Sequence, residues 1–201
     1  MHRKTLLVGL GSFLLILTVG VAVMLFARPA SFKGTIYGEP YPAAPEIELT
    51  RSDGTSFRLS EMRGNVVLIF FGYTSCPDVC PTTLAELKLA LAELSAEDAA
   101  QVKVLFVTVD PQRDTPERVQ EYVDRFNTAF IGLSGAQADL ENVWKNFGVY
   151  REVVQGESAA GYIVDHTARV TLIDQQGNLR ISFGLDTPVE DIAHDLKLIL
   201  K

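Results

Sequence analysis

The chain has 201 residues, of which 18 are basic and 25 are acidic, and its formal net charge at pH 7 is −7. This length allows one domain with its own hydrophobic core and a short appendage. The acidic balance argues against a nucleic-acid-binding protein, because such a protein is expected to carry a basic surface.

An uncharged, apolar run over residues 5–27 predicts a membrane-spanning helix. As a helix this run would be about 33 Å long, enough to cross the hydrocarbon core of a bilayer. Arg3 and Lys4 precede it, so the positive-inside rule places residues 1–4 in the cytoplasm. We therefore expect a single-pass protein of the cell membrane with its main domain outside the cytoplasm. A cleaved signal peptide is the alternative, but Ala27-Arg28-Pro29-Ala30 fits a cleavage site poorly.

Residues 28–45 are rich in Pro and Gly and predict an extended linker between the anchor and a domain over residues 46–201. At the start of this domain, Glu46–Thr50 and Ser56–Leu59 flank Ser52-Asp53-Gly54. Such a turn sequence between two short runs is typical of a β-hairpin.

The stretch Asn65–Pro81 organises the rest of the domain. Its apolar run Val66–Phe71 predicts a buried strand, and a loop with the two cysteines of the chain, Cys76 and Cys80, follows it. A helix is predicted over Thr82–Leu94. Ligands bind at the carboxyl ends of strands in open α/β sheets, and a helix N-terminus favours the reactive thiolate.

Predicted strands and helices alternate through the remaining chain, which indicates an α/β fold. The predicted elements are a strand Val102–Val109, a helix Glu117–Phe126, a strand Phe130–Leu133, a helix from a capping box at Ser134 to Phe147, a strand Val149–Val154, a loop Gln155–Gly161, a hairpin of Val170–Ile173 with Leu179–Phe183, and a final helix ending at Leu200. A cysteine pair after the first buried strand points to a thioredoxin-like fold with an N-terminal hairpin.

The cysteine pair has several interpretations. A structural disulfide would stabilise the fold little, because Cys76 and Cys80 close a very short loop. A redox pair or a metal site is the better interpretation, and two thiolates suit Cu(I) or Zn(II). Among the three histidines, His2 precedes the predicted anchor and His194 lies off the apolar stripe of the last helix. The spacing of His166, in Asp165-His166-Thr167, leaves open whether it is a ligand or a loop residue.

Three segments together resemble the Sco/SenC family: Phe71–Pro81, Val109–Pro116 and Val164–Thr167. The resemblance covers Glu46–Lys201. Proteins of this family are membrane-anchored copper chaperones with a thioredoxin fold, and they assist assembly of the copper centre of cytochrome c oxidase.

The resemblance implies that Cys76, Cys80 and His166 are ligands of Cu(I), Cu(II) or both. It also places Asp110 at an acidic position near the site, either behind the ligands or in contact with a partner. The implied partners are the copper-bearing subunit of the oxidase, a copper donor and an extracytoplasmic thiol reductant.

The first alternative is a thiol–disulfide oxidoreductase without a metal role, in which Cys76 and Cys80 are a redox pair. Three residues separate these cysteines, whereas the usual thioredoxin spacing has two. A peroxidase is a further alternative, but Pro77 stands where a peroxiredoxin carries Thr or Ser. A purely structural module would leave Asp165-His166 without a purpose.

Overall fold

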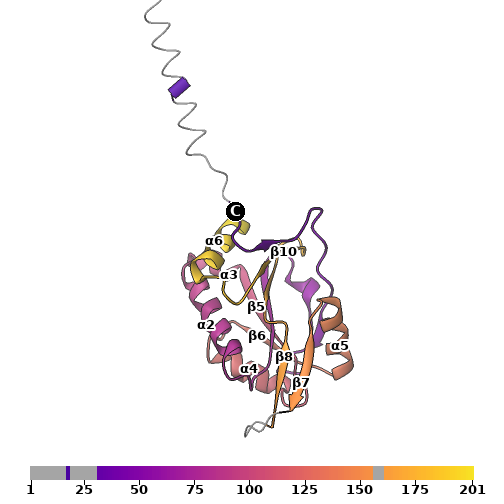
Figure 1. Cartoon of the computed structure of the whole chain (residues 1–201). Coiled ribbons are helices and arrows are strands. Elements are labelled where there is room, and N and C mark those ends of the chain that lie inside the picture. Colours follow the sequence, from indigo (N-terminus) through magenta and orange to yellow (C-terminus); the bar gives the residue numbers. More distant parts are fainter. Residues whose placement is uncertain (1–16, 19–30, 156–160) are drawn as a thin grey trace, which may run out of the picture. The chain divides into compact units, whose positions relative to one another are not determined.

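The computed structural model describes residues 17–18, 31–155 and 161–201 (Figure 1). Among these residues no helix is long and apolar enough to cross a membrane. The predicted cytoplasmic tip (residues 1–4) and anchor (residues 5–27) lie outside the described residues, apart from Leu17 and Thr18, and both remain predictions.

A six-stranded mixed sheet lies at the centre of the compact unit Phe32–Lys201. In spatial order its strands are β1 (Thr35–Ile36), β10 (Leu179–Phe183), β9 (Val170–Ile173), β4 (Val66–Gly72), β5 (Val102–Thr108) and β6 (Ile131–Leu133). The strands β4, β5 and β6 are parallel, whereas β9, β10 and β1 pair antiparallel to their neighbours. Every residue of β4 is buried, as expected for a central strand that is covered on both faces.

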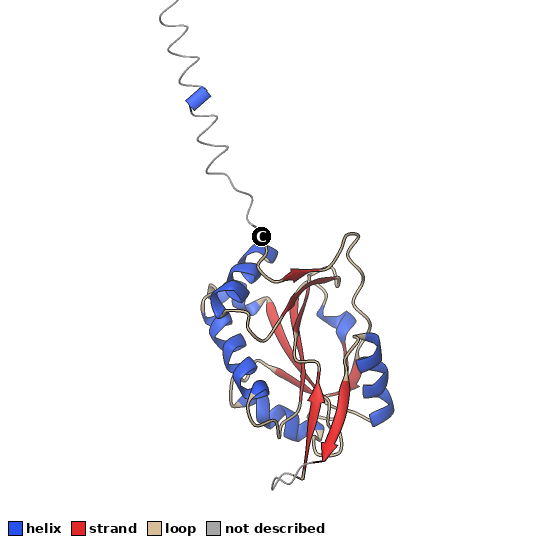
Figure 2. Ribbon diagram, viewed as in Figure 1, coloured by secondary structure: helices blue, strands red, loops and turns tan. Residues whose placement is uncertain are grey.

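Helices cover both faces of this sheet (Figures 1 and 2). They are α2 (Val79–Ala92), α3 (Ala96–Ala100), α4 (Pro116–Asp124), α5 (Gln137–Asn146) and α6 (Val189–Ile199). Neighbouring residues of a strand point to opposite faces. Thus Phe71 packs against Phe147 at the end of α5, with ring centroids 5.5 Å apart. Phe70 packs against Phe106 on the other face, where Phe106 contacts Tyr122 of α4.

Two hairpins form separate two-stranded sheets (Figure 2). The first, β2 (Glu48–Thr50) with β3 (Ser56–Arg58), confirms the hairpin predicted around Ser52-Asp53-Gly54, and a short 3₁₀ helix over Leu59–Met62 follows it. The second pairs β7 (Arg151–Gln155) with β8 (Tyr162–His166). The sequence did not predict β8, because its run of strand-favouring residues, Tyr162–Val164, is only three residues long and pairing with β7 completes the strand.

Two predicted helix starts are corrected by the structure. Helix α2 begins at Val79, earlier than predicted, because Pro81 is tolerated in a first turn, where a missing N–H would have no helical partner. Helix α5 begins at Gln137 without a side-chain cap. The predicted cap Ser134 instead donates its hydroxyl hydrogen bond to the Asp114 carbonyl at 2.6 Å.

Part of the segment interpreted as an extended linker packs as part of the domain. The backbone N–H groups of Lys33 and Gly34 donate to the buried carboxylate of Asp195, each at 2.9 Å. Strand β1 then pairs with the edge of β10. The compact unit therefore begins at Phe32, before the boundary at Glu46 that the sequence indicated.

Candidate metal and thiol site

The two cysteines lie where β4 ends and α2 begins, as the sequence predicted. Cys76 is a partly exposed residue of the connecting loop, Cys80 is fully buried in the first turn of α2, and both thiols are free. Gly72 makes room for the buried thiol, since a Cβ atom there would lie 2.8 Å from Cys80 Sγ and 2.7 Å from the Phe106 ring. The end of β4 therefore accommodates Cys80 only while residue 72 lacks a side chain.

The two sulfur atoms differ in their chemistry. A hydrogen bond from the Cys80 side chain, with further ones from His166 and from the Cys80 backbone N–H, lowers the pKa of Cys76 to about 3, although burial opposes this shift. The Cys80 N–H lies 3.4 Å from Cys76 Sγ. The hydrogen bond to Cys76, together with burial, raises the pKa of Cys80. Cys76 is therefore the accessible thiolate, and Cys80 keeps its proton.

His166 reaches this pair from the last position of β8. Its Nε2 atom lies 3.8 Å from Cys80 Sγ, and its Nδ1 atom lies 3.1 Å from the Thr167 carbonyl oxygen. A carbonyl can only accept, so Nδ1 donates to the Thr167 oxygen, while Nε2 faces Cys80 Sγ. Edge contacts with the rings of Tyr73 and Phe70, at centroid distances of 5.8 and 6.3 Å, flank the imidazole.

Two sulfurs and an imidazole nitrogen form a soft donor set that suits Cu(I). With the bond lengths of zinc sites, about 2.3 Å to sulfur and about 2.1 Å to nitrogen, the sulfur and nitrogen ligands of a three-coordinate ion lie about 3.8 Å apart. The contact between Cys80 Sγ and His166 Nε2 has this length. Within the described ranges, no three His, Cys, Asp or Glu side chains are already close enough to enclose a metal ion.

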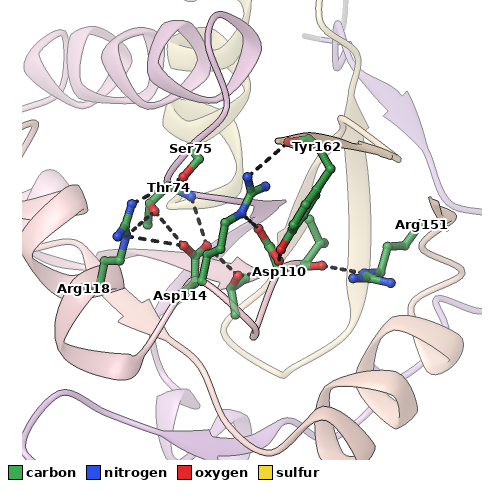
Figure 3. Close-up of polar contacts among 10 residues, drawn as sticks. Thr74, Ser75, Asp110, Asp114, Arg118, Arg151 and Tyr162 are labelled. Atoms are coloured by element: carbon green, nitrogen blue, oxygen red, sulfur yellow. Dashed lines mark hydrogen bonds and ion pairs between the residues drawn. The ribbon is translucent and has the colours of Figure 1, made fainter. Parts of the chain in front are cut away.

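Asp110 lies beside the site without touching its candidate ligands. Its carboxylate is fully buried, accepts a hydrogen bond from the Tyr162 hydroxyl at 2.8 Å, and forms an ion pair with Arg113 (Figure 3). No hydrogen bond in the described part of the chain joins it to Cys76, Cys80 or His166. Asp110 therefore contacts the strand that carries His166 rather than the ligands themselves.

Asp114 is a site residue that the sequence did not single out. It is fully buried and accepts hydrogen bonds from the Thr74 N–H (3.0 Å), the Thr74 hydroxyl (2.6 Å) and the Thr108 hydroxyl (2.7 Å), with Arg118 at 3.8 Å (Figure 3). Burial raises its pKa, although these hydrogen bonds act in the opposite direction. Asp114 therefore fixes the start of the cysteine loop. Its position in the polar loop after a buried strand was the available signal.

Cys76 and His166 line one open groove of about 310 Å³. Its walls include the exposed apolar side chains of Ile163 and Leu185 and the carboxylates of Asp78 and Asp165. An apolar groove with an accessible thiolate gives a partner's thiol or disulfide a route to Cys76.

Comparison with known proteins gives consistent matches. The SCO1/SenC family model matches residues 37–201. The SCO2-like protein of Rickettsia felis is 33% identical over 194 residues, which cover 96% of this chain and 92% of that protein. The copper-bound structure of Bradyrhizobium japonicum ScoI is 37% identical with a TM-score of 0.70, covering 78% of this chain and 99% of that chain. Apo Sco1 of Thermus thermophilus is 36% identical with a TM-score of 0.76, covering 86% and 99%.

Fold and site together define a mixed α/β, thioredoxin-like domain with two free thiols and an imidazole at the end of its central strand. The chain belongs to the SCO1/SenC family. The family and the α/β fold class predicted from the sequence are thereby confirmed.

Proposed function

We propose that this chain is a copper-binding chaperone that assists assembly of the copper centre of cytochrome c oxidase, by copper delivery, by thiol reduction of the partner, or by both. The observation that most supports this proposal is the 3.8 Å contact between Cys80 Sγ and His166 Nε2. Cys76 lines the same groove as His166. The relatives from Bradyrhizobium japonicum and Arabidopsis thaliana, 37% and 29% identical, have structures with copper bound, which supports copper as the cargo.

Cys76, Cys80 and His166 would hold the copper ion. Two thiolates suit Cu(I), and the imidazole nitrogen adds a ligand type that Cu(II) favours. Because Cys76 is accessible from the groove, a partner's thiol can replace it as a ligand and begin transfer of the ion. The proposed partners are a copper donor and the copper-bearing subunit of the oxidase.

The difference between the two sulfurs favours thiol–disulfide exchange as a second function of the same site. The Cys76 thiolate attacks a partner disulfide, one partner thiolate leaves, and a mixed disulfide forms. Cys80 then gives up its proton and attacks Cys76 Sγ, which releases the second partner thiol and leaves a Cys76–Cys80 disulfide. An extracytoplasmic thiol reductant would supply the two electrons that reopen it. Copper loading and this disulfide exclude each other, because both need the same sulfurs.

The uncharged run over residues 5–27, preceded by Arg3 and Lys4, supports a single-pass anchor in the cell membrane. The N-terminus would then lie in the cytoplasm and the thioredoxin-like domain outside it. A reporter fused after Lys201 should be active outside the cytoplasm. Activity of this fusion in the cytoplasm would contradict the proposed topology.

Copper titration of the reduced and the oxidised full-length chain tests the cargo. The reduced chain should bind one copper ion, and the oxidised chain far less, because a disulfide offers no thiolate. Equal binding by both forms would contradict a site built on Cys76 and Cys80.

A further inference from the structure

The hairpin of β7 and β8 carries His166 but does not belong to the central sheet. Within the described residues its strands pair only with each other, from Arg151↔His166 to Gln155↔Tyr162. Pairing between strands therefore does not fix the hairpin relative to the cysteine loop, and side-chain contacts contribute to its placement.

One set of side chains joins the hairpin to the end of β5, and we call Asp110, Arg113 and Tyr162 the Asp110 latch. The Tyr162 hydroxyl donates to Asp110 Oδ1 at 2.8 Å, and Arg113 Nε donates to Asp110 Oδ2. Arg113 Nη1 donates to the Tyr162 carbonyl at 3.1 Å, and the Arg113 guanidinium lies 3.7 Å from the centre of the Tyr162 ring. Figure 3 shows Tyr162 directed at Asp110. The latch thus holds both the backbone and the side chain of Tyr162.

Burial makes this latch more costly to break than a surface ion pair. The Asp110 side chain is 0% exposed and the Arg113 side chain 19%. Exposed ion pairs contribute little to stability, whereas removing one partner of a buried pair leaves an uncompensated charge and is strongly destabilising. Because Tyr162 and Arg113 each engage one oxygen of Asp110, neither can move without disturbing the buried carboxylate.

Tyr162 and His166 lie on the same face of β8. Side chains of a strand alternate between its faces, so residues 162, 164 and 166 share one face. Val164 between them is 3% exposed, whereas Ile163 on the opposite face is 39% exposed. Fixing Tyr162 against Asp110 therefore orients the whole face that presents His166 to Cys80.

The rings of Phe70 and Tyr73 flank the imidazole, but its Nδ1 hydrogen bond is to the adjacent Thr167. The Thr167 N–H in turn donates to the carbonyl of Tyr150, directly before β7, so this hydrogen bond does not tie the ring to the central sheet. We propose that Arg113 and Tyr162 are positioning residues, and that the Asp110 latch keeps His166 Nε2 within reach of Cys80 Sγ. This proposal deepens the proposed function, because it concerns the same site.

The variant Tyr162→Phe tests the latch, since it keeps the ring beneath Arg113 and removes the hydroxyl. In the reduced, copper-free, full-length chain in detergent, we expect amide hydrogen exchange in β7 and β8 to become about tenfold faster, with β4 and β5 unchanged. Arg113→Lys keeps the positive charge but loses the planar guanidinium, which donates from both Nε and Nη1. This variant should also make amide exchange in β7 and β8 faster. Hairpin exchange that equals that of the wild type in both variants would overturn the proposal.

The chain offers a matched control at Tyr41. Its ring also lies beneath an arginine, Arg180 at 3.9 Å, and Arg180 pairs with the buried Asp174 at 3.0 Å. The Tyr41 hydroxyl donates to Glu39 at 2.7 Å. Tyr41→Phe should leave exchange in the β7–β8 hairpin unchanged. If Tyr41→Phe made amide exchange in this hairpin faster by the same factor as Tyr162→Phe, the effect would not be specific to the Asp110 latch, and the proposal would be contradicted.

A spectroscopic arm separates positioning from general stability. In the copper-loaded chain, Tyr162→Phe should weaken the imidazole-nitrogen signal of Cu(II) in electron paramagnetic resonance and lower Cu(II) affinity about tenfold. In a His166→Ala background, Tyr162→Phe should not lower the Cu(II) affinity further. An equal further loss of affinity would show that Tyr162 does not act through His166. If the wild type binds no copper, the proposed function fails, and the exchange measurement still decides the latch.

Discussion

Cys80 Sγ and His166 Nε2 lie 3.8 Å apart, although 86 positions separate the two residues in the chain. Cys80 comes from the first turn of α2, and His166 comes from the last position of β8. The contact therefore exists only in the folded domain. Changes that move either element should alter the chemistry of the site as well as the stability of the fold.

The pH dependence of alkylation tests the assignment of Cys76 as the thiolate. A free thiol has a pKa of about 8.5 and loses reactivity about tenfold per pH unit below it. Because hydrogen bonding lowers the pKa of Cys76 to about 3, its alkylation rate in the reduced apo chain should stay nearly constant from about pH 8 to about pH 5. Mass spectrometry of iodoacetamide-treated protein measures this rate. A tenfold fall per pH unit would contradict the assignment, and Cys76→Ser should abolish the fast reaction.

Gly72→Ala should destabilise the domain by about 1–3 kcal/mol, because overpacking a filled core forces neighbouring side chains to shift. The added methyl group would meet Cys80 Sγ at 2.8 Å and the Phe106 ring at 2.7 Å. Urea denaturation of the reduced apo chain measures the effect. Gly38→Ala is the matched control, since a Cβ there meets nothing within 4 Å. Equal stability of the two variants would show that residue 72 does not need to be glycine.

Asp114→Ala should cost about 3 kcal/mol of unfolding free energy, because it removes the acceptor for two partly buried hydrogen bonds from Thr74 and leaves the buried Thr108 hydroxyl unsatisfied. Denaturant unfolding provides the measurement. The exposed Asp124 supplies the control, and Asp124→Ala should stay within about 0.5 kcal/mol of the wild type. A loss of less than about 1 kcal/mol of unfolding free energy in Asp114→Ala would contradict the role of Asp114 in fixing Thr74.

The elements that could be predicted have local causes. An unbroken apolar run identifies β4, and a turn sequence identifies the hairpin of β2 and β3. Strands β1 and β8 escaped prediction because pairing partners rather than their own residues define them: β1 lies on the edge of β10, and β8 on β7.

The site residues also divide into those that local sequence could place and those that depend on distant contacts. Cys76 and Cys80 could be placed from the strand and helix that flank them. Spacing alone left His166 undecided, and only the resemblance to the Sco/SenC family placed it with the cysteines. The role of Asp114 depends on a contact with Thr74, 40 positions away, which no local pattern records.

Copper titration of His166→Ala beside His194→Ala tests the three-ligand site most directly. His194 is the matched control because it is 38% exposed and binds Asp195 in α6. His166→Ala should lose the Cu(II)–thiolate absorption and retain Cu(I) more weakly, because two thiolates remain, while the melting of the apo chain changes little. His194→Ala should behave as the wild type. Unchanged binding of both copper states by His166→Ala would contradict the site and favour a thiol oxidoreductase without a metal role.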